Sequence, residues 1–219
     1  MSASGGASAS ASASGSASSG SASPATAAQL KKLVLQPTDL PAGWKGTPPE
    51  SDSGSDNADQ AMGKCVGGRD TDKDMVAEAD SDDFAMGDNS ISSSASSYKS
   101  KDDIDSDVQM LHSPRLEPCL VQMVKTELAS SLPAGAKVES ASMKITPGAG
   151  GGPSNVVATG AGRVKVGANG QQITVYLNMV FITGPLIEAD LETETVGAPL
   201  PAAMLKTLVA TVADRAAKG

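Results

Sequence analysis

The sequence predicts one α+β domain, built on an antiparallel β-sheet with helices packed on one face. Three observations lead to this prediction. Several segments alternate apolar and polar residues with the period of a strand, and others repeat apolar residues with the spacing of a helix. The last strands follow one another across turn signals, not across the long crossovers that a parallel sheet needs. The expected order of elements is β-β-α-α-β-β-β-β-α.

Composition and charge exclude several classes of function. The chain of 219 residues carries 17 Lys and Arg against 25 Asp and Glu, a net charge of −8 at pH 7. This balance argues against a nucleic-acid partner, because phosphate binding needs clustered basic side chains. One His and two Cys are too few for a typical zinc site, so we expect no metal and no cofactor. No apolar run reaches the roughly 18 residues that would span a bilayer.

The first residues are expected to form a tether. Residues 2–23 contain only Ser, Ala and Gly, which offer no side chain large enough to offset the entropy lost on ordering. Residues 1–29 are therefore predicted to be disordered, and residues 30–219 to form a single domain. The first compact apolar cluster of that domain is Leu33, Val34 and Leu35.

The prolines of residues 36–50 predict an irregular lead, because each proline removes a backbone donor and fixes φ. Trp44, the only Trp, is expected to pack on the edge of the domain or to stack on a ligand. A short helix is predicted over residues 56–65. Strands follow over residues 74–80 and 90–98, and the second of them places on one face Ile91, Ser93, Ala95 and Ser97.

Two helices come next. Ser100 followed by Asp103 is similar to a capping box and predicts the start of the first. Its apolar face carries Ile104, Val108 and Leu111. Ser113 and Pro114 predict the start of the second helix, since Pro is well tolerated at the first helical position. Apolar residues then recur at helical spacing: Leu116, Leu120, Met123, Val124 and Leu128.

The C-terminal half predicts four strands and a last helix that opens at Pro201. The glycine-rich residues 148–152 are expected to be a solvated connection between strands. The four strands are expected over residues 137–146, 156–166, 171–182 and 186–195. The last two should point inward Ile173, Val175, Leu177, Met179, Phe181, Ile187, Ala189 and Leu191.

Turn signals predict the register of the last three strands. Asn169 and Gly170 are typical of a two-residue hairpin turn, so Arg163 should lie opposite Tyr176. A three-residue loop over residues 183–185 would keep the apolar faces of the next two strands together. It predicts these further pairs: Lys165 with Thr174, Phe181 with Ile187, Met179 with Ala189, Tyr176 with Glu192 and Thr174 with Glu194.

Catalytic motifs are scarce, and we expect no catalytic residue. A serine hydrolase would have to use His112, the only His, which lies at a helix junction and is expected to be a capping or surface residue. The G-x-S-x-G nucleophile elbow is missing from the sequence. Paired carboxylates of the kind that glycosidases use stay open as an alternative, because Asp and Glu are plentiful.

Cys65 and Cys119 carry the clearest chemistry. They lie far apart in the sequence and not at C-x-x-C redox spacing. If the chain is extracytoplasmic, an even pair predicts a structural disulfide; the alternative is two buried thiols in a reducing compartment. A bridge that closes a loop of roughly 55 residues would stabilise the fold by about 4 kcal/mol in the chain-entropy model.

Several segments resemble a known family. They are the run from Asp39 to Trp44, the segment from Cys65 to Gly68, the sequence Pro118-Cys119-Leu120 and a last helix ending near Arg215. The family is that of actinobacterial secreted lipoproteins related in pattern to the extracellular sensor domain of the mycobacterial kinase PknH, and more loosely to the LpqN-type lipoproteins. The resemblance covers roughly residues 30–217. One departure is that the kinase sensor domain carries two disulfides, whereas this chain can make only one.

The resemblance implies an envelope location and a non-catalytic binding or sensing role. The small-residue tether is similar to the mature N-terminus of such lipoproteins, where a lipidated Cys would stand at about the position of Met1. The expected location is the outer face of the cytoplasmic membrane, through an anchor that this chain lacks, or the medium as a secreted protein. We expect a monomer.

The expected function is a binding or sensor-like module for a small apolar or amphiphilic molecule or for an envelope protein. Five residues are candidates for its ligand site, four of them in a pocket between sheet and helices: Trp44, Met123, Met179, Phe181 and Met204. Simple core packing is the competing role for these side chains. The alternative functions are an envelope hydrolase with paired carboxylates, which a pocket with two close carboxyl groups would favour, and a protein-docking module, which an exposed apolar patch would favour.

Overall fold

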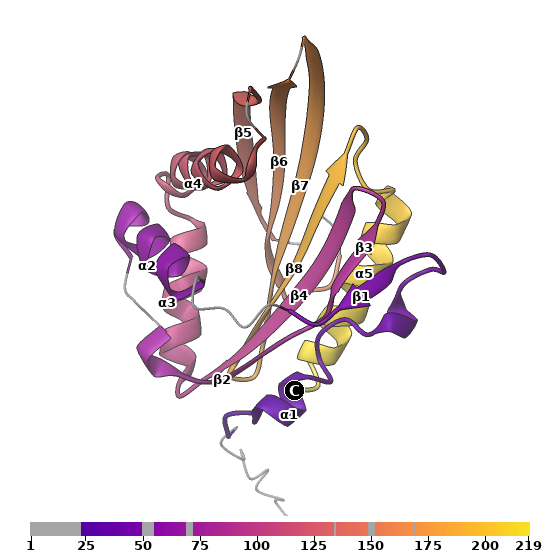
Figure 1. Ribbon diagram of the computed structural model, residues 1–219. Coiled ribbons are helices and arrows are strands. Elements are labelled where there is room, and N and C mark those ends of the chain that lie inside the picture. The colour runs from indigo at the N-terminus through magenta and orange to yellow at the C-terminus, as the bar shows by residue number, and fades with distance from the viewer. Residues whose placement is uncertain (1–22, 50–54, 69–71, 134, 149–151, 169) are drawn as a thin grey trace, which may run out of the picture.

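The computed structural model describes residues 23–49, 55–68, 72–133, 135–148, 152–168 and 170–219 (Figure 1). In these residues an antiparallel sheet of eight strands carries five helices packed against it. The predicted α+β class and antiparallel sheet are confirmed. The helices are divided between the two faces of the sheet instead of lying on one. The predicted tether before residue 23 lies outside the described residues.

The helices and the strands run in the following order. The α-helices are α1 (Ala27–Leu30), α2 (Ser55–Val66), α3 (Lys101–Leu111), α4 (Leu116–Ser131) and α5 (Ala202–Ala216). The strands are β1 (Lys45–Thr47), β2 (Met75–Asp80), β3 (Asp83–Met86), β4 (Asn89–Tyr98), β5 (Lys137–Pro147), β6 (Val156–Ala168), β7 (Gln171–Gly184) and β8 (Ile187–Val196).

The order of strands across the sheet is β1-β3-β4-β8-β7-β6-β5, and β2 pairs with β4 alongside β3. The sequence did not predict β1 and β3, which are only three and four residues long. Their pairing comes from long-range contacts, since β1 follows the proline-rich lead and is exposed along its length. Short strands of this kind carry too few residues for a periodic pattern to be read.

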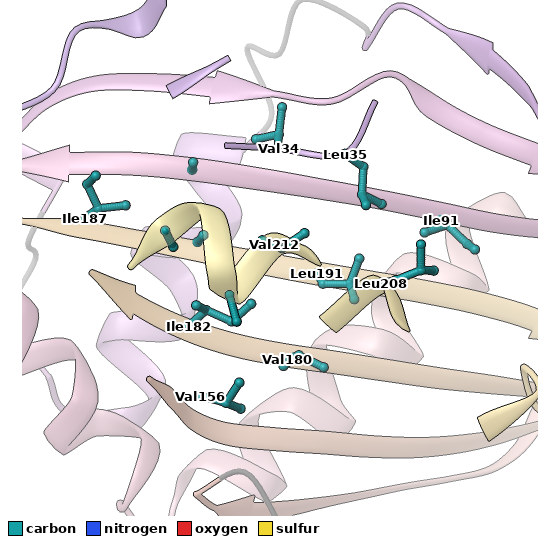
Figure 2. Close-up of a cluster of buried hydrophobic side chains, with 14 of the residues drawn as sticks. Val34, Leu35, Ile91, Val156, Val180, Ile182, Ile187, Leu191, Leu208 and Val212 are labelled. Carbon is teal, nitrogen blue, oxygen red and sulfur yellow. The ribbon is translucent and has the colours of Figure 1, made fainter. Parts of the chain in front are cut away.

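One face of the sheet forms the larger core with α5 and the N-terminal segment (Figure 2). Val180 of β7 and Leu191 of β8 lie there with Leu208 of α5, and each of the three is at most 2% exposed. Figure 2 also shows Val34 and Leu35, from the N-terminal segment, next to β4. These two side chains complete the core on the side away from β7. The first and last parts of the sequence therefore share one core.

The opposite face packs against α2, α3 and α4. Leu120 of α4 is buried with Ile145 of β5 and Ala158 of β6. Because alternate residues of a strand point to opposite faces, β7 contributes Val180 to the first core and Phe181 to this one. A strand that is apolar at both odd and even positions is buried on both faces, which explains the helices on either side.

The register of β6 and β7 is as predicted, and the register of β7 and β8 is not. Arg163 lies opposite Tyr176, with 2.9 Å from Nη2 to the phenolic oxygen and the guanidinium 5.1 Å from the ring centre. Lys165 lies opposite Thr174. On the other side of β7 the predicted pairs are wrong; the observed ones are Phe181 with Asp190, Met179 with Glu192, Leu177 with Glu194 and Tyr176 with Thr195.

The hairpin between β7 and β8 explains this error. Gly184 pairs with Ile187, so the loop has two residues, Pro185 and Leu186, instead of three. Leu186 takes φ 56°, in the left-handed region that a leucine rarely adopts. Gly184 is not a turn residue: a Cβ there would lie 2.2 Å from the Ala216 carbonyl oxygen, so a glycine is needed where α5 ends against the strand. As a result Ile187, Ala189 and Leu191 face α5.

Three local predictions also differ from the structure. Helix α4 begins at Leu116, and Ser113 and Pro114 form a turn before it. Ile173, expected inward, is 44% exposed because it lies near the free end of the β6–β7 hairpin. Ala25, inside the expected tether, is buried and its carbonyl accepts a hydrogen bond from Ser97.

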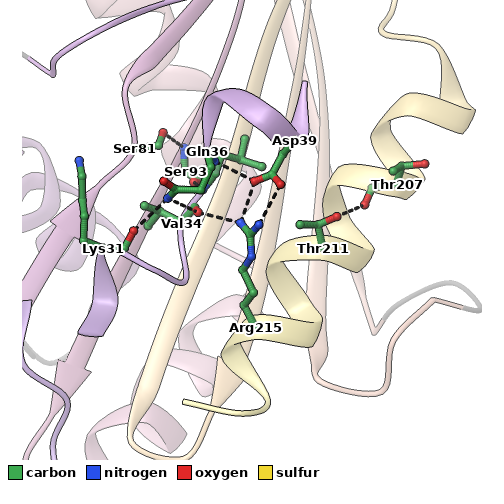
Figure 3. Close-up of polar contacts among 10 residues, drawn as sticks. Lys31, Val34, Gln36, Asp39, Ser81, Ser93, Thr207, Thr211 and Arg215 are labelled. Carbon is green, nitrogen blue, oxygen red and sulfur yellow. Dashed lines mark hydrogen bonds and ion pairs between the residues drawn. The ribbon is translucent and has the colours of Figure 1, made fainter. Parts of the chain in front are cut away.

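A half-buried ion pair joins the two ends of the chain (Figure 3). The Arg215 guanidinium donates to both oxygens of Asp39, over 2.7 and 2.8 Å, and to the carbonyl of Val34 over 2.9 Å. The Asp39 carboxylate also accepts the backbone N–H of Gln36. This two-pronged geometry is specific to a guanidinium, so α5 fixes the loop after α1 in one position.

Loss of this ion pair is expected to destabilise the fold. We expect Arg215→Ala to lower the free energy of unfolding by about 2 kcal/mol, because the Asp39 carboxylate, only 11% exposed, is left without its charged partner. Urea denaturation measures the change. The matched control is Lys218→Ala, which removes an exposed pair with Asp214 one turn away and should cost less than about 0.5 kcal/mol. Equal losses in the two variants would contradict the expectation.

Candidate binding face

The disulfide fastens α2 to the face of the sheet that carries α4. Cys65 near the end of α2 is bonded to Cys119 in α4, with 5.9 Å between the Cα atoms. The predicted bridge is confirmed, and the chain has no free cysteine. A structural disulfide between distant residues is typical of proteins that fold in an oxidising compartment outside the cytoplasm.

Five of the nine methionines gather around this bridge. We call them the methionine cluster: Met62 of α2, Met110 of α3, Met123 of α4, Met143 of β5 and Met179 of β7. Met143 is buried, and the other four are partly buried. Methionine is flexible and polarisable, so a cluster of this kind forms an apolar surface that can adapt its shape.

Two glycines of β6 make room for these side chains. A Cβ at Gly162 would lie 2.9 Å from the methyl carbon of Met143 and 3.1 Å from Leu177, and a Cβ at Gly160 would lie 3.1 Å from Ile145. Side chains of β5 and β7 therefore lean over the bare backbone of β6 from both sides. The apolar surface continues without interruption from β5 to β7.

The five residues predicted for a ligand site do not form one pocket. Met123, Met179 and Phe181 lie together in the methionine-rich face. Trp44 and Met204 pack against the other core, on the α5 side of the sheet. The periodicity of each element predicted which of its side chains face a core. It could not predict which face of the sheet a helix covers, because that depends on long-range packing.

Three acidic residues of β8 lie beside three apolar residues of β7. Leu177, Met179 and Phe181 lie opposite Glu194, Glu192 and Asp190 of β8, which in turn lie opposite Ser90, Ser92 and Ser94 of β4. Directly opposed residues point to the same face, so three successive rungs share the order apolar, carboxylate, hydroxyl. We call these nine residues the three-rung surface. Glu192 and Ser90 are exposed, and the other seven are half-buried.

At the end of the three-rung surface nearest α3, Glu188, Asp107 and Tyr98 form a group of interacting acidic side chains. Glu188 of β8 lies one rung beyond Asp190, and Tyr98 of β4 and Asp107 of α3 face it. Burial, together with the charges of Asp107 and Asp190, raises the pKa of Glu188 to about 9. Burial and the same carboxyl groups also raise the pKa of Tyr98. At neutral pH the Glu188 carboxyl is thus protonated, and it donates to Asp107 while it accepts from the Tyr98 hydroxyl.

This carboxyl pair does not have the geometry of a glycosidase. The two carboxyl groups of such an enzyme are about 5–9.5 Å apart, with substrate or water between them, whereas Asp107 and Glu188 are hydrogen-bonded to each other. Two shallow depressions lie elsewhere, one between α5 and residues 153–155, and one near the free end of the β6–β7 hairpin. His112 is exposed at the end of α3. Within the described residues, no group of His, Cys, Asp or Glu could hold a metal ion.

Comparison with known proteins adds no further constraint. No protein-family model, curated protein or solved structure matches the chain. No helix in the described ranges is long and apolar enough to cross a membrane. The features that bear on function are the methionine cluster, the three-rung surface and the disulfide.

Proposed function

We propose that this protein is a non-catalytic binding module of the bacterial cell envelope that recognises an apolar or amphiphilic molecule. The observation that carries the proposal is the methionine cluster, which collects most of the chain's flexible apolar side chains on one face of the sheet. Sites for ligands of this kind are lined mainly by apolar side chains with a few polar groups beside them. Met179 and Phe181 belong to the apolar part of the binding face, and Asp190 and Glu192 provide the polar neighbours.

The disulfide and the tether support the location in this proposal. A bridge between Cys65 and Cys119 is stable where thiols are oxidised, which is outside the cytoplasm. The small-residue composition of residues 2–23 suits a flexible spacer between a membrane and a folded domain. A lipid on the natural N-terminus would hold the domain near the membrane surface, in line with the resemblance to actinobacterial lipoproteins and to the sensor domain of PknH.

Native mass spectrometry tests the ligand and the anchor together. Protein purified from its own host, with its natural leader, should carry a diacylglycerol-type mass at the N-terminus. It should also retain a non-covalent small molecule that dissociates in the gas phase. A preparation with neither mass would contradict both parts of the proposal.

A neutral fluorescent probe tests the binding face directly. We expect 1-N-phenylnaphthylamine to bind the wild-type protein saturably, and Met179→Gln to weaken binding about tenfold, because a polar amide replaces part of the apolar surface. Met123→Gln tests the same face from α4. The matched control is Ile173→Gln, on the same strand and face as Met179 but near the free end of the hairpin. Binding that is lost equally in all three variants would contradict the assignment of this face.

A further inference from the structure

The face of the sheet that carries α5 is open over β5 and β6, because α5 packs mainly on β7 and β8. Along one rung the side chains become less exposed from β5 to β8: Ser142 and Arg163 are exposed, Tyr176 is half-buried and Thr195 is buried. We call six side chains that point to this side the open polar face: Ser142, Lys144, Arg163, Lys165, Tyr176 and Asn178.

The open polar face is basic, although the whole chain has a net charge of −8. Among the described residues, no carboxylate forms an ion pair with Arg163 or Lys165. Lys144, at the edge of the sheet, is paired with Glu117 over 3.2 Å. The acidic residues of β8 at positions 188, 190, 192 and 194 point to the opposite face. The sheet therefore separates these acids from Arg163 and Lys165.

Tyr176 holds the guanidinium of Arg163 in place. Nη2 of Arg163 donates to the phenolic oxygen over 2.9 Å, and the guanidinium lies 5.1 Å from the ring centre. A guanidinium has further N–H donors, which can bind a carboxylate in two-pronged geometry. Lys165 lies two residues further along β6, so its backbone is about 6.7 Å away. Two cationic groups are thus spaced along one strand with donors to spare.

Polar groups continue beyond the strands. The depression between α5 and residues 153–155, of about 960 Å³, lies next to the start of β6 and is lined by Lys206, Thr207 and Thr211. The two threonine hydroxyls donate to carbonyl oxygens one helical turn earlier, so their lone pairs remain able to accept. The depression therefore adds a third cation and more hydroxyl groups beside the open polar face.

We propose that the open polar face binds an acidic polysaccharide, whose carboxylates pair with Arg163 and Lys165 and whose hydroxyl groups bond to the neighbouring polar side chains. Charge complementarity selects an anionic occupant. Hydroxyl and amide side chains donate as well as accept, which suits the hydroxyl groups of a sugar. A protein partner fits less well, since the centre of a protein interface is apolar and the only wholly apolar side chain on the rungs of Ala161, Arg163 and Lys165 from β5 to β7 is Ala161 itself.

Three labelled probes test the chemistry of the occupant: a decamer of galacturonic acid, its fully methyl-esterified form, and a decamer of glutamate. Fluorescence anisotropy at low salt should give at least tenfold tighter binding of the acid than of the ester, which keeps the sugar chain and lacks the charges. The glutamate decamer has the charges without the hydroxyl groups, so it should bind at least about threefold more weakly than the galacturonate.

Matched charge variants locate the contact. Arg163→Gln combined with Lys165→Gln should weaken the galacturonate decamer about tenfold. Lys32→Gln combined with Lys125→Gln removes the same charge from exposed positions in the N-terminal segment and in α4, and should leave binding unchanged. The urea midpoint of each double variant verifies that it is folded.

Each other outcome decides against the inference or separates it from the proposed function. Equal binding of the acid and the ester, equal binding of the glutamate decamer, or equal effects of the two double variants would overturn the inference. If 1-N-phenylnaphthylamine binds and the galacturonate decamer does not, this inference fails and the proposed function stands. If the galacturonate decamer binds and the neutral probe does not, the proposed apolar ligand fails and the polysaccharide site stands, because the two sites lie on opposite faces of the sheet.

Discussion

Replacing both Cys65 and Cys119 with serine is expected to lower the free energy of unfolding by about 4 kcal/mol. The two residues are 54 apart in the sequence, so the bridge removes much of the freedom of the unfolded chain. Helix α2 packs mainly on α4, and the bridge joins these two helices covalently. The loss should therefore be largest in α2, and the sheet should keep its structure.

Urea denaturation and hydrogen exchange measure these two effects. The midpoint of unfolding should fall in the double variant, and wild-type protein in the presence of reductant should fall by the same amount. The double variant itself should not respond to reductant, which makes it the control for side effects of the reagent. Amide protection should be lost in α2 and kept in β7 and β8. An unchanged midpoint after reduction would show that the bridge contributes nothing to stability.

The variant Glu188→Gln is expected to be more stable than wild type at pH 8, by up to about 5 kcal/mol. The pKa of Glu188 is about 9 in the folded protein and has a usual value of 4.5, so the folded state holds an extra proton between these pH values. Stability from this group is complete below pH 4.5 and is lost as the pH rises toward 9. Gln keeps the donor to Asp107 and the acceptor for Tyr98 without needing that proton.

Urea denaturation between pH 5 and pH 8 tests the sign. Wild-type stability should fall with a slope of at most about 1.4 kcal/mol per pH unit from this group, and that part of the slope should be missing in Glu188→Gln. Glu139→Gln removes the same charge from an exposed position of β5, away from the acid group. It should keep the wild-type slope. Parallel pH profiles for wild type and Glu188→Gln would contradict the account of a proton held in the acid group.

Sequence patterns predicted elements and strand register correctly where a local signal is compatible with only one structure. Asn169 and Gly170 fixed the register of β6 and β7, since few other turns suit that dipeptide. The next hairpin was mispredicted because Gly184 has two meanings, a turn residue or a site of close approach, and only the position of Ala216 distinguishes them. A left-handed Leu186 has no sequence signal at all.

The binding face was predicted in part, for a similar reason. Met123, Met179 and Phe181 were expected together and lie together, whereas Met204 was assigned to the same pocket although α5 covers the other face. Met62 and Met110 were missed. The disulfide could have indicated the first of them, because Met62 lies one helical turn before Cys65 and Met123 one turn after Cys119. The three rungs could not be predicted, since they depend on the β7–β8 register.

The ion pair between Asp39 and Arg215 sets the order in which this protein can mature. A ribosome or an export channel delivers the N-terminal part first, yet Asp39 and Val34 wait for a partner that lies 176 and 181 residues later. Leu35 likewise completes a core that needs Leu208 and Val212 of the last helix. The lead through Trp44 thus cannot reach its final packing until α5 has been made, so a product truncated before α5 would be a clear target for proteases.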